Sequence, residues 1–127
     1  MTYTPKIVSP DEIRTFFTPF LSHDDIDDMT LLAKIEAVER YVSDVYFVGS
    51  YPASAKVPCI LLVASKVMME PKILYNDKYS PIKKIGDITY ESPKSISPYQ
   101  QAKSWEQMAL QMLDYQRTKW VIKLAYG

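Results

Sequence analysis

The stretch Pro58-Cys59-Ile60-Leu61-Leu62-Val63-Ala64 decides the fold, because the proline is followed by a continuous apolar run. Proline suits the first turn of a helix, and Val67 and Met68 continue the apolar pattern. A helix that is apolar on every side is buried by other elements. We therefore expect a helix of about twelve residues, ended by Pro71, as the central and most buried part of a helical domain.

Two further helices are predicted before this stretch. Ser9-Pro10-Asp11-Glu12 is a helix start, with Ser9 as cap and Glu12 completing a capping box, so a short helix should run from about Pro10 to Phe17. A long helix is expected from about Asp24 to Phe47, with acidic residues in its first turn, where the helix dipole favours them. Its apolar stripe, at alternating spacings of four and three, consists of Leu31, Ile35, Val38, Val42 and Val45.

A fourth helix is expected towards the C-terminal end of the chain. Ser97-Pro98-Tyr99-Gln100 repeats the earlier start signal, and the helix should run from about Pro98 to Gln116. Its methionines recur at helical spacing with Trp105, so we interpret them as core filler rather than metal ligands. The predicted core of the four helices comprises Leu31, Ile35, Val38, Val42, Leu61, Leu62, Trp105, Met108 and Met112.

The two ends of the chain lie outside these predicted helices. Residues 1–8 have no periodicity and contain Pro5, so we expect an N-terminal arm. Residues 118–127 are rich in β-branched and aromatic side chains, which favours a C-terminal tail that docks onto a partner as a strand. The alternative is a tail that folds back over an apolar groove of its own subunit. The expected docking residues are Trp120, Val121, Ile122, Leu124 and Tyr126.

A basic segment, residues 72–98, connects the last two predicted helices. Residues 82–85 and 87–91, on either side of Gly86, favour either a short β-hairpin or one extended ribbon. Lysines neutralise phosphates and tyrosines stack on bases, so a weak contact with nucleic acid is one interpretation and solvated loop lysines are the other. The lysines of this segment are Lys72, Lys78, Lys83, Lys84 and Lys94.

Length and composition fit one globular domain over residues 1–127, since 47% of the residues are hydrophobic and 24% are charged. The predicted fold is mainly α: a bundle of about four helices, one short, one long, one buried and one C-terminal, with the hairpin or ribbon between the last two. The lone Cys59 excludes an intramolecular disulfide and indicates a reducing compartment. The pattern includes neither a signal peptide nor a run able to cross a bilayer, so we expect a soluble, intracellular protein without membrane contact.

The net charge is zero, but the two parts of the chain differ in sign. Residues 1–44 hold nine acidic and four basic residues, a balance of −5, whereas residues 45–127 hold six acidic and eleven basic residues, a balance of +5. Opposite charges at the two ends suit head-to-tail association between copies. The other interpretation is that both sets of charges solvate helix faces.

No pattern in the sequence is typical of an active site. His23 and the acidic residues 24, 25, 27 and 28 invite comparison with a metal site, but the chain has one histidine and lacks the glycine and glutamate of a calcium loop. These residues are better explained as the N-terminal cap of the long helix. The glycines, Gly49, Gly86 and Gly127, are not clustered, which excludes a phosphate-binding loop. We therefore expect a non-enzyme without metal or cofactor.

The order of these motifs resembles the head-tail connector, or head completion, proteins of tailed bacterial and archaeal viruses. The resemblance covers about residues 8–115. It excludes the C-terminal tail and the acidic residues 24–28, which have no counterpart in the pattern. Apart from the apolar helix, the motifs are Ser9-Pro10-Asp11-Glu12-Ile13, Lys34-Ile35-Glu36-Ala37-Val38-Glu39-Arg40-Tyr41-Val42, Lys84-Ile85-Gly86-Asp87-Ile88-Thr89-Tyr90 and Ser104-Trp105.

This resemblance implies a virion structural protein, located at the head-tail interface and, during assembly, in the host cytoplasm. The resemblance implies a ring of about twelve copies that sits beneath the portal protein and extends the DNA channel. The small size of the subunit is compatible with this, since it could enclose a duplex only by rotational repetition. The ring would make non-specific contact with DNA and dock the stopper or tail-completion protein. The basic segment would face the channel or the portal. The alternatives are a non-viral helical protein-protein interaction module and a weak nucleic-acid-binding protein.

Overall fold

The computed structural model describes residues 3–17, 19–76, 84–85, 88–89 and 97–126, and the side chains of these residues except at 84–85, 88–89, 120 and 123–126. The described chain is mainly helical, as the sequence predicted. Its elements in order are α1 (Pro10–Phe16), α2 (Asp28–Tyr46), the 3-10 turn η1 (Ala53–Ala55), α3 (Lys56–Met68), α4 (Pro71–Leu74), β1 (Lys84–Ile85), β2 (Ile88–Thr89) and α5 (Pro98–Tyr126).

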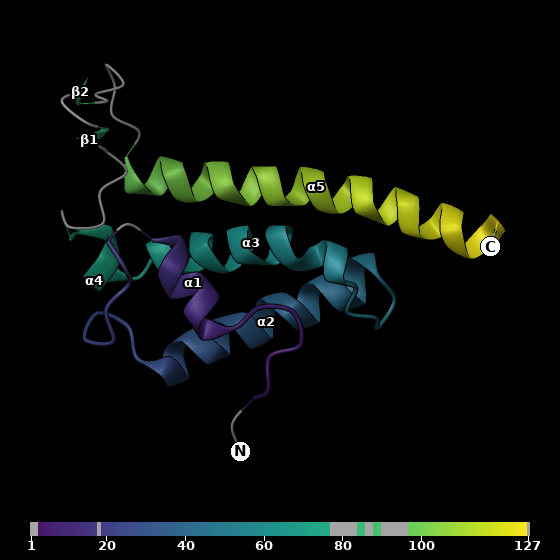
Figure 1. Cartoon of the computed structure of the whole chain (residues 1–127), viewed down its shortest axis with the longest axis horizontal. Helices are drawn as coiled ribbons and strands as arrows, with labels where there is room; N and C mark the ends of the chain where they lie inside the picture. The colour runs from purple at the N-terminus through teal and green to yellow at the C-terminus, as the bar shows by residue number, and fades with distance from the viewer. Residues whose placement is uncertain (1–2, 18, 77–83, 86–87, 90–96, 127) are drawn as a thin grey trace.

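Helix α3 is the centre of the bundle and packs against α1, α2 and α5. Figure 1 shows α3 between α2 and α5; those two helices run in one direction and α3 runs in the opposite direction. The apolar stretch of α3 explains this position, because Cys59, Val63, Ala64 and Val67 are fully buried and helices on several sides are needed to cover them. The prediction of a central buried helix is therefore confirmed.

Both predicted capping boxes start helices in the structure. Ser9 Oγ accepts from the Glu12 N–H, and the Glu12 carboxylate accepts from the Ser9 N–H, at the start of α1. At the start of α5, Ser97 Oγ accepts from the Gln100 N–H at 3.1 Å, and Gln100 Oε1 accepts from the Ser97 N–H at 3.1 Å. Each box satisfies two N–H groups that the helix itself leaves without a partner.

The long helix starts later than the sequence indicated. Residues 23–26 form a turn, and α2 begins at Asp28 with Asp27 as its cap, whose carboxylate accepts from the Thr30 N–H at 3.0 Å. Ser22 O accepts from the Asp25 and Ile26 N–H groups in that turn, so the chain reverses before the helix starts. The expectation that the acidic cluster from residue 24 onwards opens α2 was therefore wrong by one turn of helix.

Most predicted core residues of α2 and α3 are buried, but the predicted packing of α5 needs correction. Leu31, Ile35, Val38, Val42, Leu61 and Leu62 have relative exposures of 7% or less. Met108 is 49% exposed and Val45 is 46% exposed, so neither belongs to the core. Trp105 and Met112 are half-buried against it. The buried face of α5 consists of Ala102, Ala109 and Leu113, whose small or aliphatic side chains let α5 lie close to α3.

The C-terminal tail is helical, not extended. Helix α5 continues from Pro98 through Tyr126, so the expected end near Gln116 and the docking strand after it were both wrong. A helix that is already nucleated grows by one hydrogen bond for each residue it fixes, and no proline or glycine interrupts the chain before Gly127. That gain outweighs the preference of Val121 and Ile122 for strands, which is small in energy and depends on context.

Strands β1 and β2 lie between α4 and α5 and pair antiparallel, with Lys84 opposite Thr89 and Ile85 opposite Ile88. The rest of residues 77–96 lies outside the described part of the chain. The choice between a hairpin and an extended ribbon therefore stays a prediction.

Candidate functional site

The C-terminal part of α5 is the most prominent surface of the molecule. Figure 1 shows it extending past the ends of α2 and α3. Leu113 is the last fully buried residue among its described side chains, and beyond it Tyr115, Val121 and Ile122 are 61%, 55% and 53% exposed. Arg117 and Lys119 are exposed beside them. This end of α5 is apolar and basic, and within the described structure no other helix covers it.

A shallow hollow between α1 and α3 is lined by apolar and acidic side chains. Its volume is about 380 Å³, and it is lined by Asp11, Glu12, Thr15, Phe16 and Ile60. Phe16 and Ile60 are half-buried and form an apolar floor, while Asp11 is exposed on the rim. Glu12 Oε2 lies 2.9 Å from Lys56 Nζ, and this bond lowers the pKa of Glu12, which keeps the carboxylate charged at neutral pH. The hollow thus has an apolar floor and, because Lys56 compensates the charge of Glu12, one acidic residue, Asp11, on its exposed rim.

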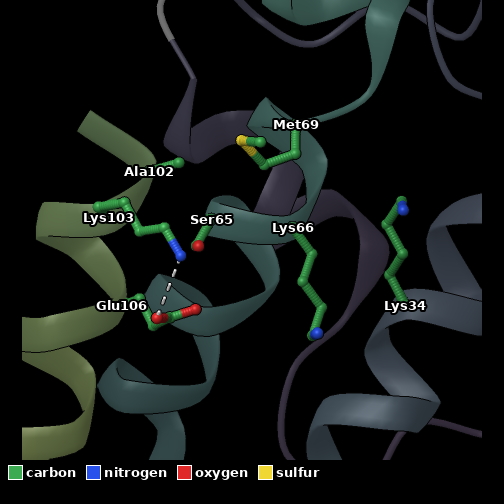
Figure 2. A pocket seen from close by; sticks show the side chains of 7 residues that line it. All are labelled: Lys34, Ser65, Lys66, Met69, Ala102, Lys103 and Glu106. Atoms are coloured by element: carbon green, nitrogen blue, oxygen red, sulfur yellow. Dashed lines mark ion pairs between the residues drawn. The ribbon is translucent and has the colours of Figure 1, made fainter. Parts of the chain in front are cut away.

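A second hollow, of about 340 Å³, lies where α2, α3 and α5 meet (Figure 2). Three lysines line it, Lys34, Lys66 and Lys103, but their ammonium groups do not converge on one point. Figure 2 shows Lys103 extending towards Glu106. The ammonium groups of Lys34 and Lys66 lie apart from that pair and from each other. Lys34 pairs with Glu70 at 2.6 Å and Lys103 with Glu106 at 3.9 Å. The amines therefore do not form a preorganised anion site.

A buried carboxylate, Glu39 of α2, fastens the N-terminal arm to the bundle. Glu39 is fully buried, and its two oxygens accept from the backbone N–H groups of Lys6, Ile7 and Val8 at 2.9, 2.6 and 2.8 Å and from the Tyr3 hydroxyl. Burial and the hydrogen bond to Glu39 raise the pKa of Tyr3 above its usual range. The predicted N-terminal arm is therefore docked onto the bundle from Tyr3 onwards.

A buried guanidinium, Arg14 of α1, holds the loop between α1 and α2. Arg14 is fully buried; Nη1 donates to Leu21 O at 3.1 Å, and Nη2 donates to Ile26 O at 2.9 Å and to Asp28 Oδ1 at 2.7 Å. His23 Nε2 lies 3.5 Å from the same Asp28 oxygen. Two of the clustered acids thus have structural roles, Asp28 in binding Arg14 and Asp27 in capping α2.

Among the residues that the structure describes, no three His, Cys, Asp or Glu side chains come together as a metal site would require. Within the same residues, no helix is both long and apolar enough to cross a bilayer. Comparison of the chain with protein-family models, with curated proteins and with solved structures finds no match.

The described residues of the predicted basic segment and of the predicted docking tail lie in different elements of the structure. In the basic segment, Lys72 is exposed in α4, and Lys84 is in β1, where only its backbone is described. Lys78, Lys83 and Lys94 lie outside the described residues. In the predicted docking tail, Trp120, Leu124 and Tyr126 fall within α5 together with the exposed Val121 and Ile122, so all five residues belong to a helix instead of a strand.

Sequence reasoning missed both buried charges, although the spacing contained a signal for each. Glu39 follows Ile35 by four residues and precedes Val42 by three, which places it on the apolar stripe of α2. Arg14 directly follows Ile13 and precedes the buried Phe17 by three. A charged residue at a stripe position indicates a buried, hydrogen-bonded group.

Cys59 is expected to be unreactive in the folded protein. It is fully buried in α3, and burial, reinforced by the charge of Glu39, raises the pKa of its thiol to about 12. Since the thiolate is the reactive form, iodoacetamide at pH 8 should modify it only in denaturant. Mass spectrometry after matched incubations with and without guanidinium measures this; rapid native modification would contradict a buried Cys59.

Proposed function

We propose that this protein is a head-tail connector subunit of a tailed virus, a virion structural protein that forms a ring beneath the portal. The observation that carries the proposal is that most of the sequence motifs coincide with the helices that build the bundle. The Ser9–Ile13 motif starts α1, residues 34–42 lie within α2, the apolar stretch forms α3, and Ser104-Trp105 lies in α5. Four of the five motifs that carry the resemblance therefore coincide with helices of the bundle, and the fifth, Lys84–Tyr90, includes β1 and β2.

In this proposal, the ring extends the DNA channel, and the segment between α4 and α5 forms a hairpin or ribbon that faces the channel or the portal. The lysines of this segment, Lys78, Lys83, Lys84 and Lys94, together with Lys72 of α4, would make sequence-independent contacts with phosphates. The partners are further copies of the chain, about twelve in a closed ring, the portal protein and the stopper or tail-completion protein. The opposed charges of the two parts of the chain support repeated contacts between copies.

The test is a pull-down against the portal and tail proteins encoded by the same genome, followed by negative-stain microscopy of the complex. We expect capture of the portal and a ring attached to it. Replacing Lys83 and Lys84 with glutamate should impair this assembly while leaving the far-ultraviolet circular dichroism unchanged. Lys66→Glu, at an exposed lysine of α3, is the control and should assemble normally. Absence of portal binding by the unmodified protein would favour a different helical interaction module.

A further inference from the structure

We propose that the projecting end of α5 docks into the hollow between α1 and α3 of a second copy of the chain. This inference rests on the proposed function for the closure of a ring, and it adds the surfaces by which neighbouring subunits meet. The projecting end is defined as residues 114–126 of α5, and the α1–α3 hollow as Asp11, Glu12, Thr15, Phe16 and Ile60.

The projecting end of α5 needs a partner for a physical reason. Most of the stability of a helix in a protein comes from packing of its apolar side chains, and the described part of the chain supplies no other helix for this end to pack against. The final turns of α5 project past α2 and α3, and the exposed side chains there include Tyr115, Val121 and Ile122 (Figure 1). Met108, Tyr115 and Ile122 follow one another at seven-residue spacing and are about half-exposed or more, so they form a narrow apolar stripe along α5. Such a stripe is typical of a helix that packs against another chain.

Among the described hollows, the charges of the lining residues favour one as the binding site for the projecting end. The projecting end carries Arg117, Lys119 and Lys123 against Asp114, a balance of +2. The hollow between α2, α3 and α5 is lined by three lysines and one glutamate and would repel it. A third hollow, over Tyr41, Leu62 and Leu110, is rimmed by the balanced pair Lys66 and Glu106. The α1–α3 hollow combines an apolar floor with the acidic rim residue Asp11.

The contact must be between copies. Helix α5 is one continuous helix, and its projecting end points away from its own α1, so it cannot turn back to the α1–α3 hollow without breaking (Figure 1). The two surfaces are different, which makes the contact heterologous; repetition of a heterologous contact closes a ring if the rotation permits. Val57 is 52% exposed and lies three residues before Ile60 on α3, a spacing that places both side chains on the same side of the helix.

Disulfide trapping tests the contact directly. Thr15→Cys marks the exposed rim of the hollow on α1, and Ile122→Cys marks the stripe on α5. The two single variants are mixed and oxidised, and the buried Cys59 stays unreactive under native conditions. We expect a disulfide-linked pair joining one variant to the other. The matched control replaces Ile122→Cys with Tyr75→Cys, at a residue 81% exposed in the segment after α4. Cross-linking no faster than in this control overturns the inference.

Self-association of the unmodified protein and of charge variants gives an independent measure. Ile122→Asp, which places a charge in the apolar contact, should weaken association at least about tenfold in sedimentation equilibrium. Asp11→Lys and Lys119→Asp should each weaken it, and the double variant should recover part of the loss. A chain that remains monomeric at all concentrations, with or without the portal, overturns the inference.

The two proposals fail differently. Rings on the portal without cross-linking between positions 15 and 122 would overturn this contact and leave the connector function supported. Cross-linked chains that form, but neither close into rings nor bind the portal, would support the contact and overturn the connector function.

Discussion

Replacing Arg14 with alanine is expected to lower the free energy of unfolding by about 2–5 kcal/mol, because two buried carbonyl groups lose their hydrogen-bond donor and each unsatisfied group costs about 1–3 kcal/mol. The guanidinium is fully buried, and its loss leaves the carbonyl groups of Leu21 and Ile26 without their donor. Such unsatisfied groups retain their desolvation cost without the compensating hydrogen bond. Urea denaturation followed by circular dichroism measures the change.

Two controls separate the charge of Arg14 from its geometry. Arg40→Ala removes an exposed arginine that pairs with Glu36 at 2.9 Å on the surface of α2, and it should change stability by less than about 1 kcal/mol. Arg14→Lys keeps the charge but loses the planar fork that serves two carbonyls and a carboxylate, so it should still be clearly destabilising. A variant at position 14 as stable as the control at position 40 would show that the buried fork does not hold the α1–α2 loop.

The second large effect is expected for Glu39→Gln, which should lower the free energy of unfolding by about 2–4 kcal/mol, because several charge-assisted hydrogen bonds are lost at once. One carboxylate oxygen accepts from Tyr3 and Lys6, and the other from Ile7 and Val8. A glutamine has one acceptor oxygen, so its NH₂ group would take the place of the second carboxylate oxygen and face two hydrogen-bond donors that it cannot accept from.

The matched control is Glu36→Gln, the same chemical change one turn earlier on α2. Glu36 is partly exposed and pairs with Arg40, so the expected change is within about 0.5 kcal/mol. Hydrogen exchange at the Val8 amide gives a local readout, since this N–H is buried and donates to Glu39. Faster exchange at Val8 with unchanged exchange in α3 would show release of the arm alone. Unchanged exchange at Val8 would contradict the role assigned to Glu39.

Local sequence determined the starts of α1 and α5 and the centre of the bundle. The capping boxes at Ser9 and Ser97 act between residues three apart, so their geometry depends on little beyond the chain itself. The apolar stretch of α3 likewise specifies burial on every side. These features were predicted from the sequence because their causes lie within one or two turns of helix.

Only the tertiary structure decided where the charges and the ends of the chain lie. Glu39 binds groups more than thirty positions away in the sequence, and Arg14 closes a loop whose carbonyls have no sequence signature. Met108 and the C-terminal residues carry the composition of a core or a strand, yet their exposure depends on where α2 and α3 end relative to α5. Burial is set by the distances between elements, which periodicity along a single helix does not encode.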